Sequence, residues 1–110
     1  VSMDGKPLTE SKKILVQVGT VARPTGWATR DVTWGAKGKG QARGKEIVSY
    51  GRPPWRLQIN DVALTLDNPT LTSATALDMN GVPTNPIPIQ HTNNQTTLKL
   101  PPDTQYAILQ

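Results

Sequence analysis

The strongest apolar run in the sequence is Ile14-Leu15-Val16-Gln17-Val18-Gly19-Thr20-Val21-Ala22. The run is rich in β-branched residues, has no helical periodicity and places apolar side chains in both alternating phases. Strands that are covered on both faces show this pattern. We therefore expect a central strand here, ended by the turn residues Pro24-Thr25-Gly26.

The rest of the chain consists of short alternating runs separated by turn residues. We expect strands at residues 27–34, 46–50, 55–59, 62–66, 71–77, 86–91, 96–100 and 106–109. Pro86 and Pro88 share one parity, which places the 86–91 strand at a sheet edge because proline donates no ladder hydrogen bond. The 55–59 and 62–66 runs have opposite phases, so Asn60-Asp61 between them predicts a hairpin turn or a bulge.

No helix start or stop signal accompanies these runs. Eight or nine short strands in 110 residues indicate an all-β fold, an antiparallel β-sandwich of the jelly-roll or immunoglobulin-like type. We expect residues 1–110 to form a single β-sandwich module cut from a longer protein.

The composition excludes several kinds of site. The chain has no cysteine, so it has no disulfide frame, no thiolate metal site and no cysteine nucleophile. A zinc site or a Ser-His-Asp triad would depend on the one histidine, His91, which we expect to be a surface or half-buried residue. The carboxylates are scattered and lie mostly at turns, so no catalytic pair is indicated. We expect a protein that is not an enzyme and uses no metal or cofactor; whether calcium stiffens a loop is left open.

The formal net charge of +4 is spread unevenly along the chain. Between positions 30 and 56 only Asp31 and Glu46 are acidic, against seven basic residues: Arg30, Lys37, Lys39, Arg43, Lys45, Arg52 and Arg56. Residues 35–45 form a Gly/Lys-rich loop that we expect to be mobile. No run of about 18 apolar residues exists, so we expect neither a transmembrane span nor a membrane partner.

The glycine-rich loop does not fit a phosphate cradle. Gln41 stands where a P-loop needs lysine, and Arg43 stands where a dinucleotide-binding loop needs its third glycine. Basic residues beside Trp34, Tyr50 and Trp55 leave single-stranded nucleic acid as a possible partner, the least favoured of three alternatives.

The tryptophans carry the main functional hypothesis. Because the chain has no phenylalanine, one or two of its three tryptophans are expected in the core, and Trp55 is a candidate since it alternates with Leu57 and Ile59. An exposed indole packs well against the flat C–H face of a pyranose and loses little rotamer entropy on binding. The expected stacking residues are Trp27, Trp34, Trp55 and Tyr50, and the expected hydrogen-bonding residues are Arg30, Asp31, Arg56 and Gln58.

Several segments resemble the C-terminal β-sandwich domains of bacterial glycoside hydrolases. Lys13–Trp27 is similar to their "lLv…vgrAeNtGm" strand, and Tyr50–Trp55 to their "WGkaPv" turn. Ala76–Gly81 and Leu98–Leu109 are similar to their ending, "…aLDanG…lp…tlyyvl". The chain departs from the pattern at Trp55, where a small aliphatic residue is usual, and in the long Gly/Lys loop.

The resemblance implies a secreted, extracellular accessory domain attached to a catalytic barrel. The leading hypothesis is a non-catalytic carbohydrate-binding module that binds β-linked glucan, of the cellulose, β-glucan or xyloglucan class. Its partners are then this polysaccharide and the catalytic domain of the parent enzyme. The second hypothesis is a structural domain that packs on the catalytic barrel and binds no ligand, which predicts an exposed apolar patch.

Overall fold

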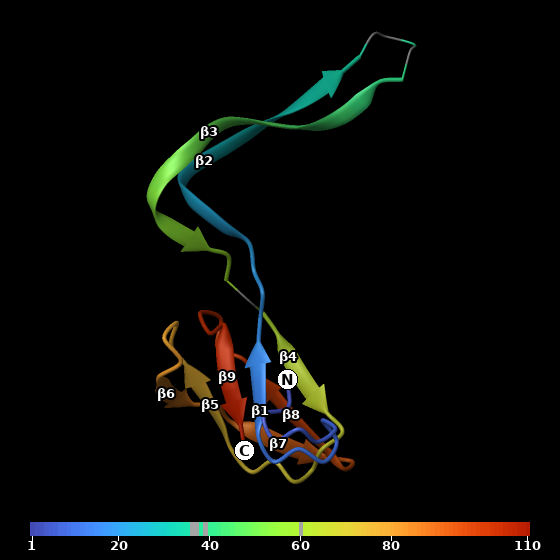
Figure 1. Cartoon of the computed structure of the whole chain (residues 1–110), viewed down its shortest axis with the longest axis vertical. Helices are drawn as coiled ribbons and strands as arrows, with labels where there is room; N and C mark the ends of the chain where they lie inside the picture. Colours follow the sequence, from blue (N-terminus) through green and yellow to red (C-terminus); the bar gives the residue numbers. More distant parts are fainter. Residues whose placement is uncertain (36–37, 39, 60) are drawn as a thin grey trace. The chain divides into compact units, whose positions relative to one another are not determined.

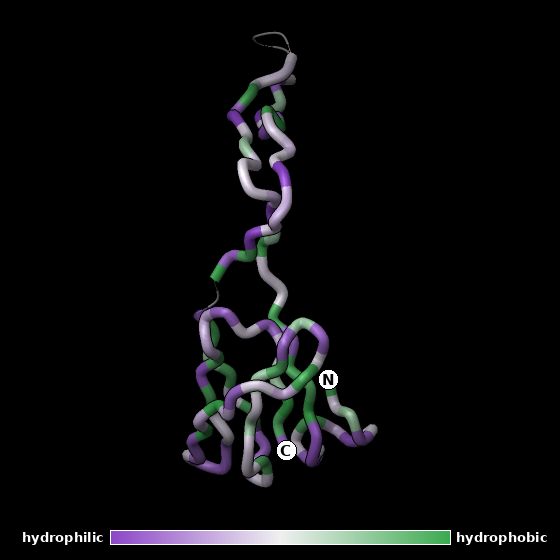
Figure 2. Tube along the Cα trace, turned by 90° about the vertical axis from the view of Figure 1, so that its left-hand side faces the viewer, coloured by the Kyte–Doolittle hydropathy of each residue, from purple (hydrophilic) through white to green (hydrophobic). Residues whose placement is uncertain are grey.

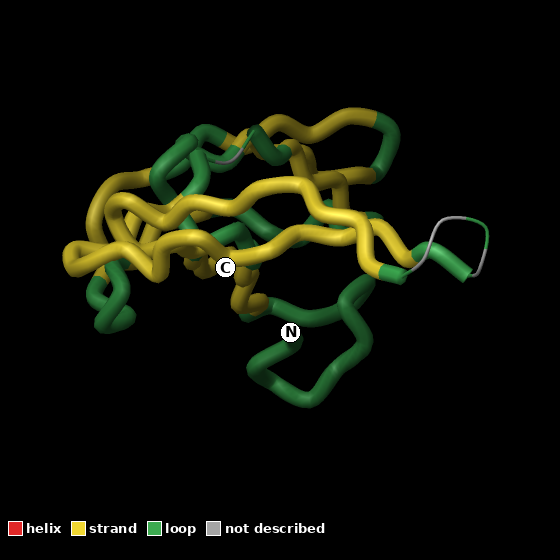
Figure 3. Tube along the Cα trace, turned by 90° about the horizontal axis from the view of Figure 1, so that it is seen from above, coloured by secondary structure: helices red, strands yellow, loops and turns green. Residues whose placement is uncertain are grey.

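The computed structural model describes residues 1–35, 38, 40–59 and 61–110. Within these residues the chain consists of strands, turns and loops without a helix, as Figure 3 shows. All the strand pairings are antiparallel. The expectation of an all-β antiparallel fold is therefore confirmed. The strands are β1 (Ile14–Gln17), β2 (Ala22–Trp34), β3 (Ala42–Leu57), β4 (Ala63–Leu66), β5 (Ala74–Leu77), β6 (Pro83–Pro86), β7 (Ile89–Thr92), β8 (Gln95–Lys99) and β9 (Tyr106–Leu109).

Contacts between residues divide the chain into two compact units. Val1–Thr20 and Ile59–Gln110 form the first, which we call the sandwich unit. Val21–Gln58 form the second, which we call the ribbon because it consists of β2 and β3. Figure 2 shows hydrophobic residues along many strands of the sandwich unit, whereas the ribbon is mostly pale or hydrophilic.

Two antiparallel sheets build the sandwich unit, with the strand labels of Figure 1. One sheet has the strand order β1-β9-β5-β6, and the other has the order β4-β8-β7. In the first sheet, Leu109 of β9 lies opposite both Ile14 of β1 and Ala74 of β5. In the second sheet, Leu98 of β8 lies opposite both Leu64 and Ile89.

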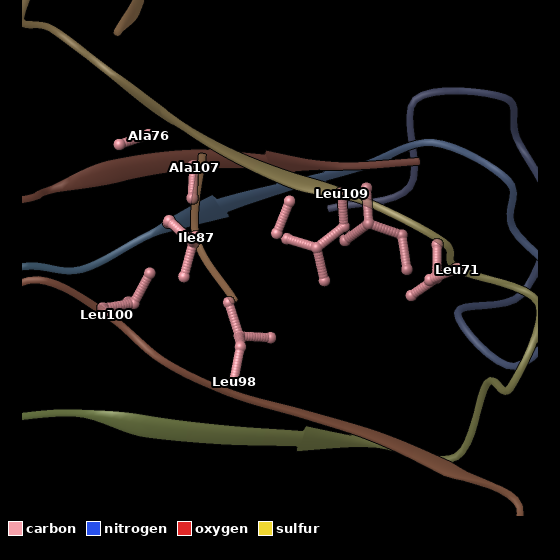
Figure 4. Close-up of a cluster of buried hydrophobic side chains, with 9 residues drawn as sticks. Leu71, Ala76, Ile87, Leu98, Leu100, Ala107 and Leu109 are labelled. Carbon is pink, nitrogen blue, oxygen red and sulfur yellow. The ribbon is translucent and has the colours of Figure 1, made fainter. Parts of the chain in front are cut away.

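One hydrophobic cluster draws side chains from both sheets, as Figure 4 shows. A core shared in this way is what a sandwich of two sheets requires, so the unit is β-sandwich-like. None of the five aromatic residues belongs to this cluster, so the prediction of a tryptophan in the core is wrong. The buried members are Ile14, Leu71, Ala74, Ala76, Ile87, Leu98, Leu100, Ala107 and Leu109.

β1 is an edge strand of its sheet, which corrects the prediction that the apolar run forms a central strand. The run also ends earlier than predicted, at Gln17. The N-terminal segment partly covers the open edge: Ser2 bridges to Ile14, and the Val1 amino group donates to the Leu15 carbonyl at 2.6 Å. These bonds satisfy part of the backbone edge that β1 would otherwise leave open.

Asp4 holds this N-terminal segment in place. Its carboxylate accepts hydrogen bonds of 2.8 Å from the Lys12 backbone N–H, from Ser2 Oγ and from Ser11 Oγ. These bonds stabilise the charged form and hold the pKa of Asp4 well below its ordinary value, and the backbone bond from Lys12 contributes most.

The ribbon pairs β2 with β3 from Ala22 opposite Leu57 to Trp34 opposite Ala42. Its register shifts twice, between Pro24 and Thr25 and between Ala28 and Thr29, where β3 contributes the extra residues. Figure 1 shows that the two strands bend together rather than run straight. The ribbon thus follows the general rule that bulges bend a strand pair and strengthen its twist.

Several predicted boundaries inside the ribbon are wrong. Residues 24–26 were expected to end one strand and residues 53–54 to separate two others. Residues 24–26 instead lie within β2, and residues 53–54 lie within β3. A two-stranded ribbon has an open edge along each strand, so a proline there interrupts no further ladder. Residues 42–45, expected in the Gly/Lys loop, belong to β3, and residues 36, 37 and 39 lie outside the described part of the chain.

Two further predictions concern the sandwich unit. The 55–59 and 62–66 runs do not form a hairpin, because β3 pairs with β2 whereas β4 pairs with β8; Asn60 lies outside the described residues. The 86–91 segment does not form one strand: its ends belong to β6 and β7, which lie at the edges of different sheets. The edge position expected from its prolines is confirmed.

Candidate functional site

The best-defined cluster of aromatic and cationic side chains lies on the ribbon. Trp27 of β2 lies opposite Tyr50 of β3, and their ring centroids are 6.0 Å apart with an interplanar angle of 81°. The Arg23 Cζ atom lies 5.1 Å from the centroid of the Trp27 ring. Trp27 is half-buried between these neighbours, whereas 73% of Tyr50 is exposed. We call these three residues the platform.

Two more arginines lie beside the platform. Arg56 is directly opposite Arg23, and Arg52 is opposite Thr25, at the register position between Arg23 and Trp27. Directly opposite residues of an antiparallel pair share a face, so Arg56 lies on the platform's face. The ion pairs of the described residues are Arg30–Glu46, Lys45–Asp31 and Lys99–Asp61, so none of these three arginines has a carboxylate partner there.

The net positive charge of the chain comes from the ribbon. Residues 21–58 contain eight Lys and Arg residues and two Asp and Glu residues, a formal charge of +6. The remaining residues contain four Lys and Arg residues and six Asp and Glu residues, a formal charge of −2, which together give the total of +4. The ribbon is therefore the electrostatically distinct part of the molecule.

Two of the predicted hydrogen-bonding residues are already engaged within the ribbon. Arg30 Nε donates to Glu46 Oε2 at 2.6 Å, and Lys45 Nζ donates to Asp31 Oδ1 at 2.6 Å. Both pairs are directly opposite in the register. Such cross-strand pairs stabilise a ribbon that has no core of its own, which gives Arg30 and Asp31 a structural role.

Trp34 lies apart from the platform. Counting along β2, Trp27 and Trp34 have opposite parity, so alternation directs their side chains to opposite faces. The Trp34 indole packs over Gly44, where an added Cβ would lie 2.7 Å from Trp34 Cζ3. About half of Trp34, 51%, is exposed.

Trp55 also faces away from the platform. It lies opposite Pro24 and is 63% exposed. Since it is adjacent in sequence to Arg56, alternation places it on the other face of β3. The three indoles therefore do not share one surface of the ribbon, because the register places Trp27 on one face and Trp34 and Trp55 on the other.

Gln58 follows β3 at the base of the ribbon. Its backbone N–H donates to the Val21 carbonyl at 2.9 Å, which extends the pairing by one step. Of the eight predicted site residues, the structure thus brings together Trp27, Tyr50 and Arg56. It adds Arg23 and Arg52, whose positions depend on the strand register and the bulges rather than on sequence spacing.

Most carboxylates accept hydrogen bonds or form ion pairs within the chain. Asp78 accepts hydrogen bonds from the backbone N–H groups of Val82 and Asn80, which lower the pKa of its carboxyl, the bond from Val82 most. Asp67 accepts a bond from Gln95. Within the described residues, no group of three or more His, Asp or Glu side chains is placed to hold a metal ion, and that part of the chain shows no helix able to span a membrane.

A groove of about 510 Å³ lies on the sandwich unit. It lies over the face of the first sheet that points away from the core. Leu15 of β1 and Ile108 of β9, which alternate with the buried residues of these strands, line it. The other apolar lining residues are Met3, Leu77, Met79, Pro83 and Tyr106. The groove is therefore lined mainly by apolar side chains.

The ribbon and the groove are thus two separate candidate surfaces, one cationic and aromatic and the other apolar. The ribbon offers an exposed ring beside guanidinium donors, which suits the recognition of a polar ligand that has flat faces. The groove offers few polar groups. Comparisons with known protein families, with curated proteins and with solved structures find no match to this chain.

Proposed function

We propose that this chain is a non-catalytic carbohydrate-binding module whose ligand binds on the ribbon platform. The observation that carries the proposal is the exposed Tyr50 ring, held edge-to-face against Trp27 and flanked by arginines that form no ion pair within the described part of the chain. A ring exposed on a polar surface and fixed by a second ring is preorganised for stacking, which lowers the entropic cost of binding.

The geometry assigns different roles to the aromatic residues. Arg23 lies over the Trp27 ring, so Trp27 mainly positions its neighbours. Tyr50 presents the free surface on which a pyranose C–H face can stack. Arg52 and Arg56 then donate hydrogen bonds to sugar oxygens. Because this surface is open and wet, binding will be weak.

The reference ligand of this proposal is a β-linked glucan, the class implied by the resemblance to glycoside hydrolase accessory domains. The same resemblance supports a module that is secreted and attached to a catalytic domain, which it would hold close to polysaccharide. The proposal requires only that the chain bind sugar without cleaving it.

Fluorescence titration of the whole chain with cellohexaose and xyloglucan oligosaccharides tests the proposal. We expect saturable binding that Tyr50→Ala weakens by about tenfold, which is about 1.4 kcal/mol. Trp34→Ala is the matched control, because Trp34 is an exposed aromatic residue on the opposite face. Equal losses in both variants, or no binding to any glycan, would reject the platform as a sugar site.

The groove on the sandwich unit favours a second candidate, a structural domain that packs on a catalytic barrel. Under this alternative no glycan changes the tryptophan fluorescence. The dye ANS, which binds exposed apolar surface, would instead bind at the groove, and Ile108→Glu would abolish that binding. ANS binding that Ile108→Glu leaves unchanged would reject the candidate.

A further inference from the structure

The charged residues that lie directly opposite each other in the ribbon differ along its length. In the stretch that carries Arg30 and Asp31, each of these residues lies opposite a residue of the other sign and forms an ion pair with it. At the platform, Arg23 lies opposite Arg56. Directly opposite charged residues therefore have opposite signs in one stretch of the ribbon and the same sign at the platform.

Unmatched arginines have an energetic cost. Like charges directly opposite each other in an antiparallel pair destabilise the pairing. Arg52 adds a third positive charge at the register position between Arg23 and Trp27. No carboxylate of the described residues is paired with any of the three. A bound anion would remove this repulsion.

We propose that the ligand of the platform is an acidic polysaccharide, in which sugar rings carry carboxylate groups. This inference rests on the proposed function and narrows it, because it replaces a neutral glucan by a uronic acid chain. A guanidinium binds a carboxylate through two parallel N–H···O bonds, which adds geometric specificity to the charge attraction. The sugar ring stacks on Tyr50 while its carboxylate binds Arg52 or Arg56.

The distribution of aromatic residues favours a sugar over a nucleic acid. Proteins that bind single-stranded nucleic acid stack successive bases on successive aromatic side chains along a basic groove. Here the platform's face presents one freely exposed ring, Tyr50, because Trp34 and Trp55 face the other way. One stacking ring beside several arginines suits a single acidic sugar unit better than a run of bases.

The test compares two ligands that differ only in charge. Cellohexaose and the hexasaccharide of β-1,4-linked glucuronic acid share their backbone and linkage, but the second carries a carboxylate in place of each hydroxymethyl group. We expect the whole chain to bind the acidic hexasaccharide at least about tenfold more tightly, with an affinity that falls as salt is added. Oligothymidylate of similar charge serves as the competing polyanion.

Matched variants locate the binding. The double variant R52Q/R56Q should lower affinity for the acidic hexasaccharide by about tenfold and affinity for cellohexaose clearly less, because glutamine still donates hydrogen bonds but carries no charge. K6Q/K12Q removes the same amount of charge from the sandwich unit and should change neither affinity. The salt dependence of the unmodified chain provides a readout that is independent of how the variants fold.

The possible outcomes separate the inference from the proposed function. Equal or tighter binding of cellohexaose, without salt dependence, overturns the acidic ligand and leaves a neutral-glucan module. An equal effect of both double variants shows non-specific charge attraction and also overturns it. Failure of both sugars to bind rejects the proposed function itself, and tighter binding of oligothymidylate assigns the platform to nucleic acid.

Discussion

At the scale of single residues, Gly51 explains how the platform is held. Its φ is +68°, a left-handed conformation that glycine adopts without steric cost. A Cβ at this position would lie 2.5 Å from the Thr25 carbonyl oxygen and 2.8 Å from the Trp27 nitrogen. Both are backbone atoms of the opposite strand, so no side-chain rotation can relieve the clash. Gly51 therefore allows Trp27 and Tyr50 to approach each other.

Gly51→Ala should separate the two strands at the platform and lower glycan affinity by about tenfold or more. A left-handed alanine already costs about 1–2 kcal/mol, and the backbone clash adds to this. Titration of the variant measures the effect. Gly81→Ala is the control, because Gly81 has a similar φ of +81° but no atom within 4 Å of an added Cβ. If both variants lose affinity equally, or neither does, the strand approach at Gly51 does not shape the platform.

The charge state of Asp4 couples the stability of the fold to pH. The pKa of its carboxyl is lowered in the folded chain, chiefly by the Lys12 backbone N–H. A lowered pKa means that the charged form stabilises the folded state above the unfolded pKa of about 4. This stabilisation is lost as the pH falls from there toward the folded value.

The variant Asp4→Asn should melt at a lower temperature than the unmodified chain at neutral pH. An asparagine at this position points its NH₂ group at one of the N–H or O–H groups that now donate hydrogen bonds to the Asp4 carboxylate. That hydrogen bond is lost, because two donors then face each other. The difference in melting temperature between the two proteins should shrink as the pH is lowered below about 4. Melting curves recorded across this range check the prediction, and a difference that stays constant with pH would contradict it.

At the scale of elements, alternation of apolar residues predicted β4, β8 and β9 to within one residue at each end. Residues 106–109 form β9 as expected, because alternate residues of this run point into one core. The ribbon was missed as a unit, since its prolines and glycines indicate turns in a sheet but are tolerated in a strand pair with two open edges. The platform was predicted only in part, because the partners of Trp27 depend on two register shifts that no local pattern reveals.

The core face of β9 predicts a contrast between neighbouring residues. Leu109 is fully buried, whereas the adjacent Ile108 faces the groove. Leu109→Ala should therefore lower the free energy of unfolding by about 2–5 kcal/mol, the usual cost of a cavity in a core. Ile108→Ala should cost clearly less. Chemical denaturation of both variants measures the contrast, and similar losses would mean that the two faces of the sheet are equally packed.

At the scale of the whole molecule, stability and charge reside in different units. The hydrophobic cluster belongs to the sandwich unit, whose formal charge is −2. The ribbon carries a formal charge of +6, and its side chains lie outside that cluster. Substitutions on the ribbon should therefore change binding with little effect on the unfolding of the sandwich unit.

The difference in charge between the two units also explains why the isoelectric point of the whole chain is a weak guide to its binding partner. A sequence pI near 9.7 describes the average of an acidic unit and a basic one. The charges available to a ligand on the ribbon are those that do not form ion pairs within it. Arg30 and Lys45 form ion pairs with their cross-strand partners, whereas Arg23, Arg52 and Arg56 have no carboxylate partner among the residues that the structure describes. The unpaired arginines, rather than the total charge, determine the class of ligand proposed.

The central claim is that the ligand binds on the platform's face of the ribbon. The most direct measurement is a titration of the isotope-labelled whole chain with the β-1,4-linked glucuronic acid hexasaccharide, followed by NMR. The indole N–H groups of Trp27, Trp34 and Trp55 give three separate signals from different places on the ribbon. We predict that the signals of Trp27 and of the backbone around Tyr50 shift, while those of Trp34 and Trp55 stay in place. Shifts that concentrate at Trp34, at Trp55 or around the groove at Leu15 and Ile108 would contradict the account.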